Sequence, residues 1–221
     1  MATSVKDLFA HQVHIGHKTD KWNPKMRPFI FAKQNGVHVF DLTKTSECLE
    51  KAKQFLHTVK AQGGHVLFVG TKPQTSIVLK EILEGKKHFF IDEKWAPGLL
   101  TNFNELRKRI DYYLNLKSQF ESGEIKKYTK KEVAKFKKEL EKLGEAYHGV
   151  AEMRKRPAVL VSLDGVGNRL AIEEANISKI AVVGLLDSNA DPDGIDFPIP
   201  GNDDSIKSIR FVLQNLVESL A

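Results

Sequence analysis

The 221-residue chain contains a single cysteine, Cys48. One thiol cannot form an intramolecular disulfide bond, and it cannot supply a zinc site built from cysteines. No apolar run approaches the roughly 18 residues that a membrane-spanning helix needs. Residues 1–17 lack the succession of basic flank, apolar stretch and small cleavage-site residues that marks an export signal. We therefore expect a protein of the reducing cytoplasm that has no membrane partner.

Signatures of catalysis are also missing. The sequence has no Gly-x-Ser-x-Gly elbow and no isolated pair of carboxylates with catalytic spacing. Residues 164–168 imitate a dinucleotide-binding fingerprint, but Leu170 stands where that fingerprint needs its third glycine. Residues 70–72 imitate the start of a phosphate loop, but Pro73 removes an amide that could point at phosphate. We predict no catalytic residue, no cofactor of the nucleotide class and no small-molecule substrate.

Basic residues outnumber acidic residues by 34 to 28, and this excess is concentrated in one segment. Residues 105–156 contain fifteen basic and nine acidic residues, which accounts for the whole excess. Residues 1–44 contain seven basic and three acidic residues, whereas residues 187–221 contain two basic and seven acidic residues. The asymmetry indicates a polyanionic partner that contacts one side of the protein only.

Alternating apolar patterns predict a doubly wound α/β layer. Near-continuous apolar runs at residues 65–69, 89–91, 158–161 and 180–186 are typical of strands buried on both faces of a parallel sheet. Amphipathic helices are expected near residues 49–59, 73–84, 170–176 and 206–220. Ahead of this layer, apolar residues alternate about Asn35 and Gly36, which predicts an N-terminal β-hairpin because both residues tolerate the positive φ of a tight turn.

The pattern changes to heptad spacing between the two halves of this layer. Positions 106, 110, 113, 117 and 120 form one stripe, and positions 133, 136, 140, 143 and 147 form a second. Lys117 weakens the first stripe, so Leu116 is expected to share the packing. Two such stripes joined by a short polar link predict an antiparallel coiled-coil α-hairpin. We expect an α/β domain of residues 1–104 and 157–221, with residues 105–156 inserted as the hairpin.

Cations mixed with aromatic and amide side chains predict RNA binding, because cations contact phosphates and aromatic rings stack on bases. The predicted residues of the first loop are Lys18, Lys21, Trp22, Asn23, Lys25 and Arg27. Those at the root of the hairpin are Lys94, Trp95, Thr101, Asn102, Arg107, Lys108 and Arg109, and those near its bend are Lys126, Lys127, Lys130 and Lys131. The alternative is that these residues form a solvated loop and the outer face of a coiled coil.

The acidic C-terminal quarter raises the alternative of a divalent metal site. His17, Asp187 and Asp204 are the candidate ligands, which come together only if the N-terminal segment crosses the acidic end of the sheet. The competing explanation is that such acids cap turns and helices. Asn202, followed by Asp203 and Asp204, is typical of a helix that begins with a cap and an acidic first turn.

Eight short stretches of the sequence together form a pattern that is specific to one protein family. They are residues 13–17 (VHIGH), 22–26 (WNPKM), 28–31 (PFIF), 35–38 (NGVH), 41–45 (DLTKT), 66–72 (VLFVGTK), 100–103 (LTNF) and 199–206 (IPGNDDSI). In this order, over nearly the whole chain, they resemble the bacterial-type small-subunit ribosomal protein S2 family. Residues 95–98 depart from it, because the family usually has Trp-Leu-Gly-Gly where this chain has Trp-Ala-Pro-Gly.

The resemblance implies a flavodoxin-like sheet, an inserted coiled-coil hairpin and assembly into the small ribosomal subunit against rRNA. It also implies neighbouring ribosomal proteins, including ribosomal protein S1 in many bacteria. We therefore expect a structural constituent of a cytoplasmic or organellar ribosome. Two alternatives stay open: a doubly wound enzyme that binds a nucleotide or metal at the carboxyl ends of its strands, and a coiled-coil adaptor protein.

Overall fold

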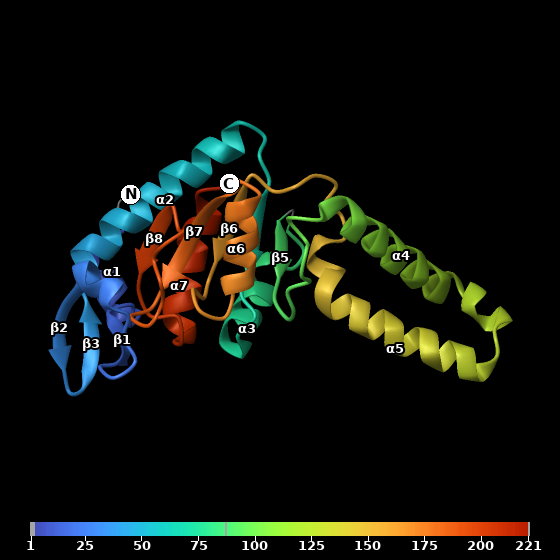
Figure 1. Cartoon of the computed structure of the whole chain (residues 1–221), viewed down its shortest axis with the longest axis horizontal. Coiled ribbons are helices and arrows are strands. Elements are labelled where there is room, and N and C mark those ends of the chain that lie inside the picture. The colour runs from blue at the N-terminus through green and yellow to red at the C-terminus, as the bar shows by residue number, and fades with distance from the viewer. Residues whose placement is uncertain (1–2, 87, 221) are drawn as a thin grey trace.

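The structure, a computed structural model, describes residues 3–86 and 88–220 (Figure 1). A five-stranded parallel sheet lies at its centre, in the order β5-β4-β6-β7-β8. The strands are β4 (Val66–Val69), β5 (Phe89–Ile91), β6 (Val159–Ser162), β7 (Ala181–Leu186) and β8 (Phe197–Pro200). Numbered along the sheet-forming part of the chain, this is the flavodoxin-like order 2-1-3-4-5. The predicted doubly wound α/β fold is confirmed.

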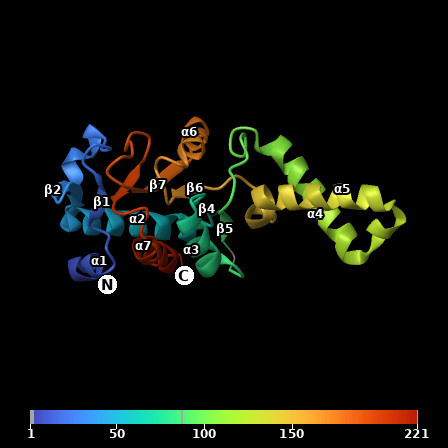
Figure 2. The same ribbon diagram turned by 90° about the horizontal axis from the view of Figure 1, so that it is seen from below.

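Helices cover both faces of this sheet, and every residue of β4 and β6 is buried between them. One face packs against α2 (Leu42–Ala61), α3 (Pro73–Leu83) and α7 (Ile206–Glu218), and the opposite face carries α6 (Arg169–Ile177) (Figure 2). The two faces bury separate apolar clusters, as the alternation of side chains along each strand requires.

The N-terminal region forms a second, antiparallel sheet in the order β1-β3-β2. A short helix α1 (Val5–Ala10) precedes β1 (Ile15–Lys18), β2 (Ile30–Gln34) and β3 (Val37–Phe40). Asn35 and Gly36 adopt φ values of 50° and 76° at the turn, so the predicted hairpin is confirmed. Between β1 and β2, a 3-10 helix at Pro24–Phe29 closes the basic loop.

An arm of two antiparallel helices, α4 (Phe103–Ser122) and α5 (Lys130–Tyr147), extends from the opposite end of the molecule (Figure 1). The helices turn at Gly123, which has a φ of 78°, and Thr129 and Glu132 form a capping box at the start of α5. Leu116 is buried and Lys117 is exposed, as expected for the first stripe. Ile110, near the root of the arm, belongs to the same apolar cluster as the adjoining sheet face.

Candidate nucleic-acid interface

Three features organise the predicted RNA-binding residues: the basic loop of residues 18–27, the Trp95 loop of residues 94–102, and the arm. Lys18, Lys21 and Arg27 are exposed in the basic loop. Lys25 instead reaches across to the acidic segment after β7, where its amine lies 2.9 Å from an oxygen of Asp191 and also contacts Asp193. Hydrogen bonds to Asp193 and Asp191 raise the pKa of Lys25, so its charge is already balanced within the chain.

Trp22 and Asn23 serve the local structure of the basic loop. The Trp22 ring is half-buried, with its centroid 5.2 Å from that of His38 and the Lys33 amine 5.6 Å above it. Asn23 caps the 3-10 helix by accepting a hydrogen bond from the Lys25 amide (3.0 Å), and its own amide donates to the carbonyl of Ser188 (2.7 Å). These contacts fix the loop against the α/β layer.

The Trp95 loop is organised by one buried carboxylate, Glu174 of α6. The Trp95 indole donates a hydrogen bond to it (3.0 Å), as do the amides of Gly98 (2.7 Å) and Leu100 (3.0 Å). Thr101 donates from both its amide and its hydroxyl (3.3 and 3.2 Å). Five donors therefore converge on a single side chain, which the sequence pattern placed within the helix near residues 170–176 without indicating this role.

The pKa of Glu174 reflects these contacts. Burial alone would raise it, but the hydrogen bonds from Trp95, Gly98, Leu100 and Thr101 outweigh burial and lower the pKa. Glu174 is thus ionised at neutral pH, and in the part of the chain that the structure describes its charge is distributed over neutral donors rather than paired with a cation. The loop that carries Lys94 and Trp95 is consequently held in one position beside the arm.

At the root of the arm, the three consecutive arginine and lysine residues differ in their surroundings. Arg107 donates to the carbonyls of Ala151 and Met153, both at 2.9 Å, and ties α4 to the chain leaving the arm. Lys108 pairs with Glu105 at 2.8 Å on the helix surface. Arg109, like Lys94 on the Trp95 loop, is exposed and forms no ion pair within the described part of the chain. Thr101 and Asn102 are also exposed beside them.

Near the bend, Lys126, Lys127, Lys130 and Lys131 are exposed in a row around the start of α5. Lys127 lies 5.5 Å from the ring centroid of Tyr128. Within residues 3–86 and 88–220, no carboxylate forms an ion pair with any of the four. The arm therefore ends in a concentration of positive charge that its own acids do not neutralise.

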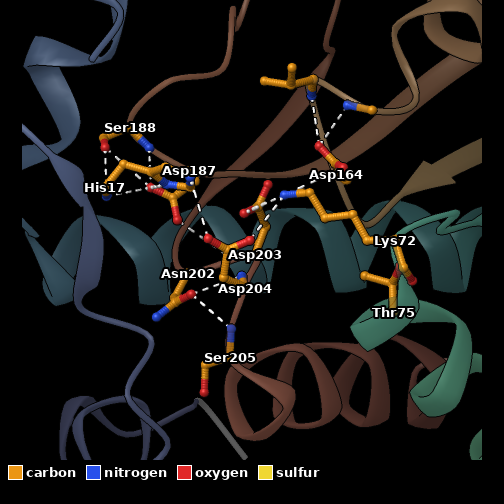
Figure 3. Close-up of polar contacts among 12 residues, drawn as sticks. His17, Lys72, Thr75, Asp164, Asp187, Ser188, Asn202, Asp203, Asp204 and Ser205 are labelled. Carbon is orange, nitrogen blue, oxygen red and sulfur yellow. Dashed lines mark hydrogen bonds and ion pairs between the residues drawn. The ribbon is translucent and has the colours of Figure 1, made fainter. Parts of the chain in front are cut away.

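A separate charge cluster occupies the carboxyl ends of β4, β6, β7 and β8 (Figure 3). The Lys72 amine lies 3.0 Å from Asp203, 3.2 Å from Asp204 and 3.4 Å from Asp164. Burial lowers the pKa of Lys72, but the three carboxylates more than offset this and raise it. Burial and the neighbouring Asp187 carboxylate raise the pKa of Asp203 to about 7, although Lys72 opposes this.

The predicted metal candidates meet in this cluster. Figure 3 shows His17 between two acids, with its Nδ1 2.9 Å from Asp187 and its Nε2 3.3 Å from Asp204. The hydrogen bond that His17 donates to the Asp187 carboxylate raises the pKa of His17, although burial lowers it. Potential ligand atoms of His17, Asp187 and Asp203 lie within 4.8 Å of one another, so Asp203 rather than Asp204 completes the most compact set.

The predicted helix cap at Asn202 is wrong. Helix α7 begins after Ser205, and Asn202 uses its side chain to accept hydrogen bonds from the amides of Asp204 (2.9 Å) and Ser205 (3.0 Å). Asp203 and Asp204 therefore lie in the turn before the helix, where they face Lys72 (Figure 3). The position at which many doubly wound enzymes bind a ligand is lined here by the chain's own lysine and acids.

Comparison with known proteins agrees with the fold and the sequence motifs. Residues 8–221 match the model of the family described as ribosomal protein S2. The chain belongs to this family. A small ribosomal subunit protein uS2 from Dehalococcoides mccartyi strain 195 is 37% identical over 218 residues, covering 99% of this chain and 89% of the relative. The uS2 proteins of strains BAV1 and CBDB1 are each 36% identical over the same lengths.

Membership of the ribosomal protein S2 family supports a structural role in the small ribosomal subunit. The family is one of structural proteins rather than enzymes, which confirms that part of the prediction and disfavours the enzyme alternative. A location on ribosomes in the cytoplasm agrees with the same assignment. No helix among the described residues is long and apolar enough to cross a membrane.

Proposed function

We propose that this protein binds rRNA of the small subunit through the arm, the Trp95 loop and the exposed cations of the basic loop. The observation that carries the proposal is the row of unneutralised lysines near the arm's bend, together with Lys94 and Arg109 at its root. Exposed cations that lack intramolecular acids displace the counterions condensed on RNA phosphates. The release of these counterions drives protein–RNA association.

The α/β layer acts as the scaffold for these contacts. The acids of this layer gather at the Lys72 cluster, and Figure 1 shows the N-terminal sheet at one end of the molecule and the arm at the other. The arm packs its root into the sheet cluster through Ile110, whereas among the described residues its distal half packs one arm helix against the other. We infer that residues 105–156 are an inserted unit whose distal part moves independently of the α/β domain.

The test compares the full chain with a variant in which Lys126, Lys127, Lys130 and Lys131 are replaced by alanine. A small-subunit rRNA transcript is titrated with each protein across a salt series. We expect the slope of log affinity against log salt to flatten by about three, since each phosphate contact contributes roughly 0.7–0.9. A control variant removes four exposed lysines elsewhere: Lys6, Lys51, Lys179 and Lys207. Equal slopes for the two variants would contradict a specific role for the arm.

We further propose, from the family resemblance, that the protein contacts neighbouring ribosomal proteins, including ribosomal protein S1. Sedimentation of a lysate in a sucrose gradient tests this level of the account. We expect the protein to follow the small subunit and to co-purify with adjacent ribosomal proteins. Partner binding that is insensitive to salt, in a fraction free of ribosomal subunits, would favour the coiled-coil adaptor instead.

For the charge cluster, we infer that Lys72 is the cation that stabilises the acids, because it contacts three of them. A divalent cation on His17, Asp187 and Asp203 is the alternative. Elemental analysis of protein dialysed against metal-free buffer distinguishes the two. Stoichiometric zinc or magnesium would show that the cluster is a metal site, and no retained metal would support Lys72 in that role.

A further inference from the structure

A groove of about 640 Å³ lies where the Trp95 loop meets the arm. Lys94, Trp95 and Pro97 line it from the loop, Arg109 and Tyr112 from α4, and Lys135, Lys138 and Lys142 from α5. This volume falls in the range typical of pockets that hold small ligands or single nucleotides. The groove is therefore large enough for a nucleotide but too small for a folded domain.

The charge of this groove is strongly biased. Five cations line it (Lys94, Arg109, Lys135, Lys138 and Lys142), and Glu139 is the one acid among its lining residues. None of the five cations forms an ion pair with a carboxylate in residues 3–86 and 88–220. Their like charges line one groove, and together they create a positive potential that attracts an anion. The positive charge of the groove therefore favours a polyanionic ligand over an apolar one.

An aromatic surface accompanies these charges. Tyr112 is 44% exposed although it lies on a packed helix, and its ring lines the groove. Burial, together with the neighbouring Glu139 carboxylate, raises the pKa of the Tyr112 hydroxyl, so the phenol is uncharged at neutral pH. Across the groove, Trp95 is fixed by its hydrogen bond to Glu174. The groove thus combines a positioned aromatic face with cations, as proteins that bind single-stranded RNA do.

We propose that this groove seats one unpaired nucleotide of rRNA, with the base against Tyr112 and the flanking phosphates on Arg109, Lys138 and Lys142. The proposal rests on the proposed rRNA binding and adds a specific seat to it. An A-form duplex keeps its bases stacked and its wide minor groove shallow, so it cannot place a base in a pocket. The groove therefore selects an unstacked nucleotide in a bulge, a loop or a single strand.

The decisive experiment measures binding of the full chain to three probes: a small-subunit rRNA transcript, a ten-nucleotide oligoadenylate and an RNA duplex of ten base pairs. Tyr112→Ala should weaken oligoadenylate binding about 5- to 100-fold, the range expected for one lost aromatic stack, and leave duplex binding unchanged. Tyr112→Phe should retain the stack and bind like the wild type. The control Tyr128→Ala removes an exposed ring outside the groove.

A second matched pair tests the phosphate contacts. Lys138→Ala removes a groove lysine, and Lys137→Ala removes its neighbour, which is exposed but does not line the groove. Each variant loses one charge from the same turn of α5. Lys138→Ala should reduce oligoadenylate binding about 3- to 10-fold more than Lys137→Ala. Equal losses would assign the effect to overall charge and contradict the groove as a seat.

The outcomes separate the two levels of proposal. A wild-type protein that binds none of the three probes overturns the proposed rRNA binding. A wild-type protein that binds the rRNA transcript, with Tyr112→Ala indistinguishable from it on oligoadenylate, overturns the nucleotide seat alone. A further competition experiment adds an oligoglutamate peptide or oligoadenylate to the complex of the protein with the rRNA transcript. Displacement of the transcript by oligoglutamate but not by oligoadenylate would assign the groove to an acidic protein instead.

Discussion

The basic loop and the arm both carry exposed cations, but Lys25 of the basic loop differs from the cations of the arm groove in its surroundings. In the basic loop, Lys25 is neutralised by Asp191 and Asp193, which lie more than 160 residues away along the chain. In the groove beside the arm, Arg109 and Lys138 have no such acids among the described residues. A cation already paired within the protein has less to gain from a phosphate. A count of basic residues along the sequence therefore overstates the positive charge that the basic loop can offer to phosphate, because it includes Lys25.

The largest effect should follow from removing Glu174, which holds the Trp95 wall of the groove. Glu174→Ala leaves five hydrogen-bond donors of residues 95–101 without an acceptor. Each unsatisfied buried donor costs roughly 1–3 kcal/mol, so we expect a loss of at least about 3 kcal/mol in the free energy of unfolding. Urea denaturation measures this. Glu174→Gln, which keeps the shape and one acceptor oxygen, should lose less; equal losses would contradict the hydrogen-bond explanation.

The arm offers a second test, because its root and its middle differ in burial. Ile110→Ala should destabilise the whole protein by about 2–5 kcal/mol, since Ile110 is fully buried in the cluster that reaches the sheet. Leu140 is only partly buried, so Leu140→Ala should cost less and loosen the arm alone. Hydrogen exchange distinguishes the two. Faster exchange of β4 and β6 amides in Leu140→Ala would mean that the arm and the sheet unfold as one unit.

Acid should release the Trp95 loop. The pKa of folded Glu174 is lowered, so its contribution to stability is complete above the ordinary glutamate value of about 4.3 and is lost as the pH falls through the lower folded value. Fluorescence of Trp95 in a Trp22→Phe background should report this release below about pH 4. The Glu174→Gln variant should lack this transition. A transition of the same size in that variant would mean that other carboxylates control the loop.

The smallest effect is expected at Lys25. Lys25→Ala should change affinity for small-subunit rRNA by less than about twofold, because its charge is held by Asp191 and Asp193. Asp191→Asn combined with Asp193→Asn should have the opposite effect and strengthen binding, since it frees the Lys25 amine. A salt series with both proteins checks this. A large loss in Lys25→Ala would show that phosphate displaces the aspartates in the complex.

Local sequence patterns predicted the alternating strands and helices of the α/β layer, but they did not predict the edge strands β8 and β1. Strand β8 went unpredicted because Pro198 and Pro200 interrupt the usual pattern; as an edge strand paired only to β7, it tolerates them. Strand β1 was not predicted, because its short sequence carries no clear strand pattern and its extended backbone is recognised only from its pairing with β3. The positive-φ turn at Asn35 and Gly36 was predictable, because its cause lies in those two residues themselves.

The candidate site was less predictable, since its contacts join residues that are distant in sequence. Composition identified the exposed cations, yet nothing near Lys25 or Glu174 in the sequence reveals the partners that each has in the fold. The Lys72 cluster shows the same limit. His17, Asp187 and Asp204 were candidates that would meet only if the N-terminal segment crossed the acidic end of the sheet. Lys72 was not among these candidates, because only the topology of the sheet brings it to them.

One measurement tests the central claim, that cations without intramolecular acids carry the RNA contacts. The slope of log affinity against log salt is determined for small-subunit rRNA with wild type, with Arg109, Lys138 and Lys142 all replaced by alanine, and with Lys25→Ala. We predict that the triple variant flattens the slope by about two, whereas Lys25→Ala leaves it unchanged. An unchanged slope in the triple variant, together with a flattened slope in Lys25→Ala, would contradict the account, because a cation already paired within the chain would then contact RNA while the unpaired cations of the groove would not.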